Sequence, residues 1–143
     1  MQTVPSFRIP LEGKVQDLII PTIDSVRNKF LLSLFIKQKS HMLLTGPTGT
    51  GKTVNIINEL NINYFNDTCT NLITAFSGQT TCNQVQRAIE NKMSSRRGKG
   101  RFGPEDRKDK IVIFIDDLNM PAKEKYQAQP PIEILRQWMD EGL

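Results

Sequence analysis

Apolar residues recur at helical spacing in some stretches of the chain and form short unbroken runs in others. Helical spacing predicts helices over 23–38, from Gly51 to about Leu60, from a cap at Thr80 or Thr81 to about 93, and from Pro130 onwards. The apolar stripes of these helices are Ile23, Val26, Phe30 and Leu34; Val54, Ile57 and Leu60; Val85, Ile89 and Met93; and Ile132, Leu135, Trp138 and Met139. The short runs predict strands over 41–45, 72–76 and 111–115.

The run at 111–115 indicates how the strands are arranged. Its five consecutive apolar residues, mostly β-branched, are typical of a strand that is buried on both faces in a parallel sheet. Strands and helices alternate along the chain, and 143 residues suffice for one compact domain. The predicted fold class is therefore an α/β sandwich with a parallel sheet.

A glycine-rich segment between the first strand and the second helix matches the pattern G-x-x-x-x-G-K-S/T. It reads Gly46, Pro47, Thr48, Gly49, Thr50, Gly51, Lys52, Thr53. Glycines let backbone N–H groups converge on phosphate oxygens, and the following helix directs its positive end to the same anion. Lys52 can reach the β- and γ-phosphates, while the Thr53 hydroxyl can bind Mg²⁺. The segment predicts a nucleotide site.

An acidic pair, Asp116 and Asp117, directly follows the apolar run at 111–115. In P-loop nucleotide hydrolases, a carboxylate at the end of such a strand holds Mg²⁺. Asp116 fits this role, and Asp117 is the candidate for a catalytic carboxylate that polarises the attacking water. Asp117 is one methylene shorter than glutamate, so its reach to that water stays an open question.

Together these motifs resemble the AAA+ class of P-loop ATPases and, within it, the dynein heavy chains. The resemblance rests on residues 43–53, on 115–121 (IDDLNMP) and on 128–138 (AQPPIEILRQW). The sequence is similar to the third AAA+ module of the axonemal branch, and the similarity extends from about Ile19 to the last residue. The resemblance implies a partial AAA+ large subdomain over 19–143, a three-layer α/β/α sandwich, with residues 1–18 as an N-terminal extension.

The resemblance also implies a function and a set of site residues. ATP and Mg²⁺ would bind at a site that tunes the motor rather than generating force, with an adenine contact from Ile19, Ile20, Pro21 and Thr22. Ser77 or Gln79 would sense the γ-phosphate, while Asn119 fits a loop cap better than a site residue. The implied partners are neighbouring AAA+ modules, other dynein subunits and, through the parent protein, microtubules. The implied location is the cytoskeleton, in the axoneme of cilia.

The sequence departs from an AAA+ core at its end, because residue 143 precedes the last strands, their polar sensor, the arginine for a neighbouring subunit and the helical lid. We expect a truncated core that binds nucleotide weakly and hydrolyses it negligibly on its own. Steady-state ATPase activity that disappears in Lys52→Ala would contradict this expectation.

Charge raises an alternative function but does not favour it. The chain has 19 Lys and Arg against 15 Asp and Glu, and the basic excess lies in one Gly- and Ser-rich segment, 92–110, predicted to be an exposed loop. A nucleic-acid-stimulated ATPase could use this loop, yet Phe102 alone gives no stacking platform, so we expect no nucleic-acid partner. A non-catalytic interaction fragment is the other alternative, which nucleotide-dependent thermal stabilisation would distinguish. A P-loop kinase would need an acceptor site that no motif indicates.

Other classes are excluded by simple patterns. Apolar runs are far shorter than the roughly 20 residues of a membrane span, and the N-terminus has no apolar signal core. Cys69 and Cys82 provide neither a disulfide framework nor the spacing of a metal site. We therefore expect no membrane association and a reduced, intracellular protein.

Overall fold

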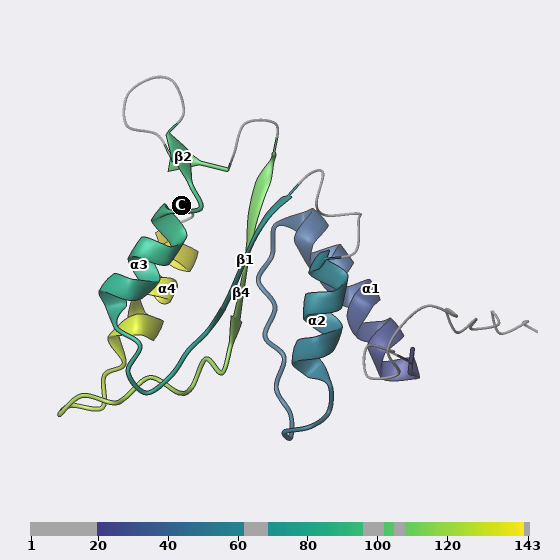
Figure 1. The fold of residues 1–143 in the computed structure, drawn as a ribbon, viewed down its shortest axis with the longest axis horizontal. Coiled ribbons are helices and arrows are strands. Elements are labelled where there is room, and N and C mark those ends of the chain that lie inside the picture. Colours follow the sequence, from purple (N-terminus) through teal and green to yellow (C-terminus); the bar gives the residue numbers. More distant parts are fainter. Residues whose placement is uncertain (1–19, 62–68, 96–101, 105–107, 142–143) are drawn as a thin grey trace, which may run out of the picture.

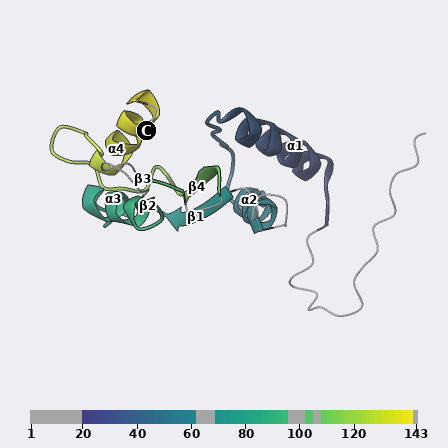
Figure 2. The ribbon, with the colours of Figure 1, turned by 90° about the horizontal axis from the view of Figure 1, so that it is seen from above.

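The computed structural model describes residues 20–61, 69–95, 102–104 and 108–141. Two parallel strands, β1 (Cys69–Ala75) and β4 (Lys110–Asp116), form the centre of the fold. Helices α1 (Ile23–Gln38) and α2 (Lys52–Asn61) cover one face of this pair, and α3 (Cys82–Glu90) and α4 (Pro130–Glu141) cover the other (Figures 1 and 2). The layering confirms the predicted α/β/α arrangement.

The two central strands are aligned along their whole length. Cys69 lies opposite Lys110 and Ala75 lies opposite Asp116. The N–H of Phe76 donates to the carbonyl of Asp116 at 3.0 Å, which extends the pairing by one step. Successive side chains of a strand point to opposite faces. Consequently, Val112 and Phe114 face α1 and α2, whereas Ile115 faces α3 and α4.

The prediction of a strand over 41–45 is wrong. These residues connect α1 to the glycine-rich loop and make no backbone–backbone hydrogen bond to any described residue. Leu44 packs against the apolar cluster beneath α1 and α2, but Leu43 is 72% exposed. An apolar run supplies a surface for packing, whereas a strand also needs a neighbouring backbone, and sequence periodicity contains no information about that neighbour.

The predicted exposed loop over 92–110 is also wrong in part. Its ends form a second, antiparallel sheet in which β2 (Ser94–Ser95) pairs with β3 (Phe102–Gly103). Residues 96–101 and 105–107 lie outside the described part of the chain. Pairing between backbones needs no apolar alternation in so short a hairpin, so composition alone could not reveal it.

Helix α1 begins and ends as its sequence predicts. The Thr22 hydroxyl accepts from the Ser25 N–H at 3.1 Å, and the Ser25 hydroxyl accepts from the Thr22 N–H at 2.7 Å, which is a capping box. At the other end, Lys39 adopts the left-handed conformation (φ 55°). The Ser40 N–H then donates to the Phe35 carbonyl at 2.9 Å. Both ends are thus closed by local hydrogen bonds.

The predicted apolar face of α1 is wrong in orientation, and that of α2 is wrong at Val54 but confirmed at Leu60, which is 1% exposed. The stripe Ile23, Val26, Phe30 and Leu34 points outward, and Phe30 is 66% exposed. The buried side of α1 is formed instead by Leu32 and Ile36. In α2, Val54 is 53% exposed, while Ile56 is buried beside Leu60. α1 is apolar on two opposite sides, so its spacing identified the helix but not the side that packs on the sheet.

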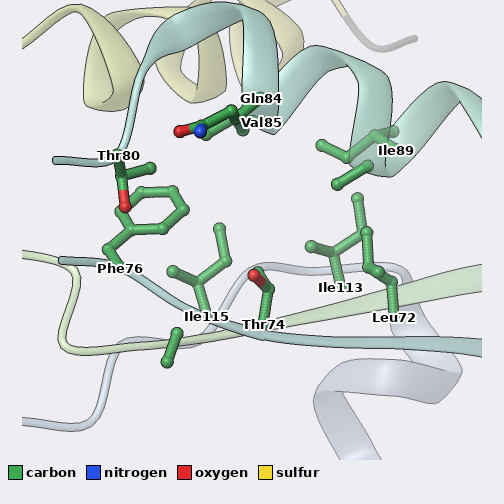
Figure 3. Close-up of a pocket in the computed structure, with 11 residues that line it drawn as sticks. Leu72, Thr74, Phe76, Thr80, Gln84, Val85, Ile89, Ile113 and Ile115 are labelled. Carbon is green, nitrogen blue, oxygen red and sulfur yellow. The ribbon is translucent and has the colours of Figure 1, made fainter.

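Helices α3 and α4 pack together over the second face. Thr81 caps α3 through a capping box with Gln84, and Val85 and Ile89 are buried as predicted. From α4, Ile134, Leu135 and Trp138 join the same cluster, whereas the predicted Met139 is 51% exposed. A cavity of about 260 Å³ remains between α3 and the sheet, where Val85 and Ile89 face Ile113 and Ile115 (Figure 3).

The described residues show neither a membrane-spanning helix nor a group of metal ligands. No helix among them is both long enough and apolar enough to span a bilayer. Within the same ranges, no three His, Cys, Asp or Glu side chains cluster as ligands of a metal ion would.

Candidate functional site

The glycine-rich loop lies at the end of the molecule where both central strands finish. It follows the extended segment 41–45, and α2 begins at its last two residues, Lys52 and Thr53 (Figure 1). Gly49 and Gly51 have φ angles of 79° and 73°, a region that other residues rarely adopt. The loop conformation therefore favours glycine at both positions; the motif specifies glycine at 51 and leaves position 49 open. The carboxyl ends of parallel strands are the usual place for a ligand in such sheets.

Lys52 folds back over the loop that precedes it. Its ammonium donates to the carbonyl of Gly46 at 3.1 Å, to the carbonyl of Pro47 at 2.5 Å and to the hydroxyl of Thr50 at 3.1 Å. The Thr50 hydroxyl in turn donates to the Pro47 carbonyl at 3.0 Å. All three acceptors are neutral. Among the described residues, no carboxylate forms an ion pair with Lys52.

Asp116 is the last residue of β4 and lies on the face that α1 and α2 cover. It follows Val112 and Phe114 at the strand's two-residue period, and both pack in the cluster with Leu44 and Ile56. One Asp116 carboxylate oxygen accepts from the Asp117 N–H at 3.1 Å. The carboxylate and the loop thus share one face and one end of the sheet, and none of the described hydrogen bonds or ion pairs joins them directly.

Asp117 leaves the strand through an unusual backbone conformation. Its φ angle is 51°, in the left-handed region, and its side chain is exposed. Its carbonyl accepts from the Met120 N–H at 2.9 Å, which closes the turn after β4. The turn directs the chain away from the sheet immediately after Asp116. Asn119 lies in this turn, and its carbonyl accepts from the Gln129 amide at 3.4 Å.

The remaining candidates from the sequence take no part in the hydrogen bonds of the loop or fall outside the described residues. Ile20 and Pro21 precede α1 and are exposed, with Ile20 at 64%, and Ile19 falls outside the described part. Ser77 forms a turn with Thr80, whose hydroxyl accepts from the Ser77 N–H at 2.8 Å. That turn precedes the cap of α3, so a local structural role accounts for its polar groups.

Two polar residues that no motif singled out connect the site's helices to the sheet. Lys110 on β4 donates to carbonyls at the end of α1, and Asn71 on β1 donates to a carbonyl at the end of α2. These contacts join residues 74 and 11 positions apart. A lysine before an apolar run and an asparagine in a strand give no sequence signal for such long-range bonds.

The sequence of residues 7–143 matches the family described as "P-loop containing dynein motor region". Human "Dynein axonemal heavy chain 3" is 49% identical over 138 residues, covering 94% of this chain. Human "Dynein axonemal heavy chain 1" is 48% identical over 142 residues (99% of this chain), and mouse "Dynein axonemal heavy chain 12" is 48% identical over 130 residues (91%). The chain spans only 3% to 4% of the length of these relatives.

These matches agree with the geometry of the loop and the layered α/β fold. Family membership also implies that a nucleotide, ATP, binds at a P-loop. With a match over nearly its whole length, the chain belongs to the family of P-loop containing dynein motor regions.

Proposed function

We propose that this chain is part of the third AAA+ module of an axonemal dynein heavy chain, and that it binds Mg²⁺–ATP at a regulatory site. In this proposal, residues 19–143 form part of the AAA+ large subdomain and residues 1–18 precede it as an extension. The nucleotide site tunes an ATP-driven microtubule motor of cilia rather than producing force itself. The similarity to axonemal heavy chains over 91–99% of this chain supports the assignment to that branch.

The hydrogen bonds around the Lys52 ammonium give the main support for this proposal. Its ammonium is held inside the glycine-rich loop by three neutral oxygens, with no described carboxylate to neutralise its charge. Charge-assisted hydrogen bonds to phosphate are stronger than those to neutral oxygens. A nucleotide phosphate can therefore replace these carbonyls, while the loop's N–H groups and the start of α2 add further attraction.

The residues at the same end of the sheet fit Mg²⁺. The cation prefers oxygen ligands and retains several waters, so one hydroxyl, one carboxylate and the nucleotide phosphates suffice. Thr53 opens α2 beside Lys52, and Asp116 ends β4 on the face towards α2. When bound, the cation would neutralise charge on the phosphates. Asp117 is the candidate for the carboxylate that activates water, and the adenine contact is assigned to Ile20 and Pro21.

The outer stripe of α1 supports a partner within the same heavy chain. Ile23, Val26 and Phe30 are each more than half exposed and lie on one side of the helix. A helix that is apolar on two opposite sides is typical of one packed between two layers. We assign neighbouring AAA+ modules to this surface. Other dynein subunits and microtubules are partners of the parent protein, in the axoneme of cilia, and we assign no nucleic-acid or membrane partner.

The proposal is tested by nucleotide binding with and without Mg²⁺. We expect ATP to raise the unfolding temperature of the chain, because a ligand that binds only the folded state stabilises it by about 2.7 kcal/mol at 100 times its dissociation constant. Asp116→Asn should reduce the gain in ATP affinity on adding Mg²⁺ about 10- to 100-fold, as is usual for a group that holds a metal through water. Titration calorimetry in Mg²⁺ and in EDTA measures both.

Asp109→Asn is the matched control for this experiment. Asp109 is an exposed aspartate just before the opposite end of the same strand, so its substitution removes the same charge. It should leave the Mg²⁺ dependence of ATP affinity unchanged. Equal affinities of the Asp116→Asn variant and the wild-type chain in Mg²⁺ would contradict the assignment of Asp116, and absence of any ATP binding would refute the nucleotide site.

A further inference from the structure

Two side chains of the sheet donate hydrogen bonds to the far ends of the helices that flank the glycine-rich loop. The Lys110 ammonium donates to the Ile36 carbonyl at 2.9 Å and to the Lys37 carbonyl at 3.3 Å. The Asn71 amide donates to the Leu60 carbonyl at 2.7 Å. The last carbonyls of a helix lack partners within the helix, and a cation is favourable there. Both helices therefore end at groups of the sheet.

These two donors act on the same side of the molecule. Cys69 lies opposite Lys110 and packs in the cluster beneath α1 and α2, and Asn71 follows Cys69 on the same face of β1. Lys110 begins β4 and Asp116 ends it, a separation of about 20 Å at 3.3 Å per residue. Leu60 lies near the end of α2, about 12 Å from Lys52 at 1.5 Å per residue. The hydrogen bonds of Lys110 and Asn71 are thus at the end of the sheet opposite the glycine-rich loop and Asp116.

The hydrogen bonds of Lys110 and Asn71 join the sheet directly to the ends of α1 and α2. The layer between the helices and the sheet is apolar, formed by Leu44, Val112, Phe114 and Ile56 among others. Apolar burial is non-directional, so it holds the layers together without fixing how they slide. The segment 41–45 makes no backbone hydrogen bond to a described strand residue, so no β-ladder fixes it. Hydrogen bonds, in contrast, require defined distances and angles.

We propose that Lys110 and Asn71 are positioning residues of the nucleotide site. They set the distance between the phosphate loop, with Thr53, and the Asp116 carboxylate, and so control how strongly Mg²⁺ strengthens nucleotide binding. Lys110 acts through α1 and the segment that leads into the loop, and Asn71 acts through α2. This inference rests on the proposed Mg²⁺–ATP site, to which it adds residues that do not touch the ligand.

The test is the ratio of the ATP dissociation constants in EDTA and in Mg²⁺, measured on the 143-residue chain. Lys110→Met keeps most of the side-chain stem but removes the donor. We expect this ratio to fall about 2- to 30-fold, the range in which residues that touch neither ligand change the coupling between two sites. Asn71→Leu should lower it in the same direction. Lys110→Arg should restore it, because a guanidinium also donates to carbonyls.

Lys108→Met is the matched control, since it removes the same charge two residues earlier. Lys108 is half-buried, and in the described part of the chain the carbonyls at the end of α1 accept from Lys110 rather than from Lys108. It should leave the ratio unchanged. The inference would be overturned if Lys110→Met and Asn71→Leu had the same ratio of dissociation constants as Lys108→Met. This holds even if the two variants unfold at lower temperatures, because a merely structural role lowers stability without changing the ratio. Should Lys110→Met not fold, as judged by circular dichroism, Asn71→Leu decides alone.

A second readout separates this inference from the proposed function. Hydrogen exchange of the amides in 41–53, measured without nucleotide, should be faster in Lys110→Met than in Lys108→Met, because the loop loses its distant anchor. If the wild-type chain bound no ATP, the proposed function would fail and the exchange comparison would still decide whether Lys110 holds the loop. Equal exchange in the two variants would overturn the inference.

Discussion

Lys52→Ala is expected to weaken ATP binding about 100-fold, the upper end of the range expected for Asp116→Asn. Hydrogen bonds to charged groups contribute about 1.5–3 kcal/mol each, and the ammonium is placed to make at least one such bond to phosphate. The variant also removes the donor to Gly46, Pro47 and Thr50, the three oxygens that Lys52 holds together. Both the attraction for the anion and the internal support of the loop are lost.

Titration of the wild-type and Lys52→Ala chains with ATP measures this difference. Lys92→Ala is the control, because Lys92 is an exposed lysine in the 92–110 segment, and it belongs to neither the loop nor α2. It changes the net charge by the same amount, so it reports any general electrostatic effect. A wild-type affinity in Lys52→Ala would show that the glycine-rich loop does not bind the phosphates. A loss of equal size in Lys92→Ala would point to non-specific attraction.

The sequence predicted those parts of the site in which neighbouring residues along the chain form both the recognisable motif and the binding groups. The loop from Gly46 to Thr53 is continuous, its glycines adopt the backbone angles that the motif requires, and α2 begins where expected. Asp116 directly follows the apolar run 111–115 and ends β4, so that run also located the carboxylate. Helix starts were predicted well because capping residues such as Thr22 and Thr81 act within three positions.

The parts that the sequence did not predict depend on residues far apart in the chain. Residues 41–45 have the composition of a strand but no paired neighbour, and the stripe of α1 that contains Phe30 faces outward. Neither fact can be obtained from spacing, because a periodic pattern shows that a face is apolar but not what covers it. The hydrogen bonds of Lys110 and Asn71 to helix ends could not be predicted from the sequence for the same reason.

Leu60→Ala is expected to have the largest effect on stability, lowering the free energy of unfolding by about 2–5 kcal/mol. Leu60 is 1% exposed and lies in the last turn of α2, where it packs with Ile36, Ile56 and Cys69. Alanine would leave a cavity in the layer that joins α2 to the sheet. Because small domains have only about 5–15 kcal/mol of stability in total, the loss is a large fraction of it.

Val54→Ala in the same helix is the matched control for urea unfolding of the two variants. Val54 is 53% exposed, and alanine favours the helix more than valine does, so the control should unfold at the wild-type urea concentration or slightly above it. A Leu60→Ala midpoint close to that of Val54→Ala would contradict the packing of α2 on the sheet. Because Lys52 and Thr53 begin the helix that Leu60 anchors, Leu60→Ala should also reduce ATP affinity at temperatures where part of the chain is unfolded.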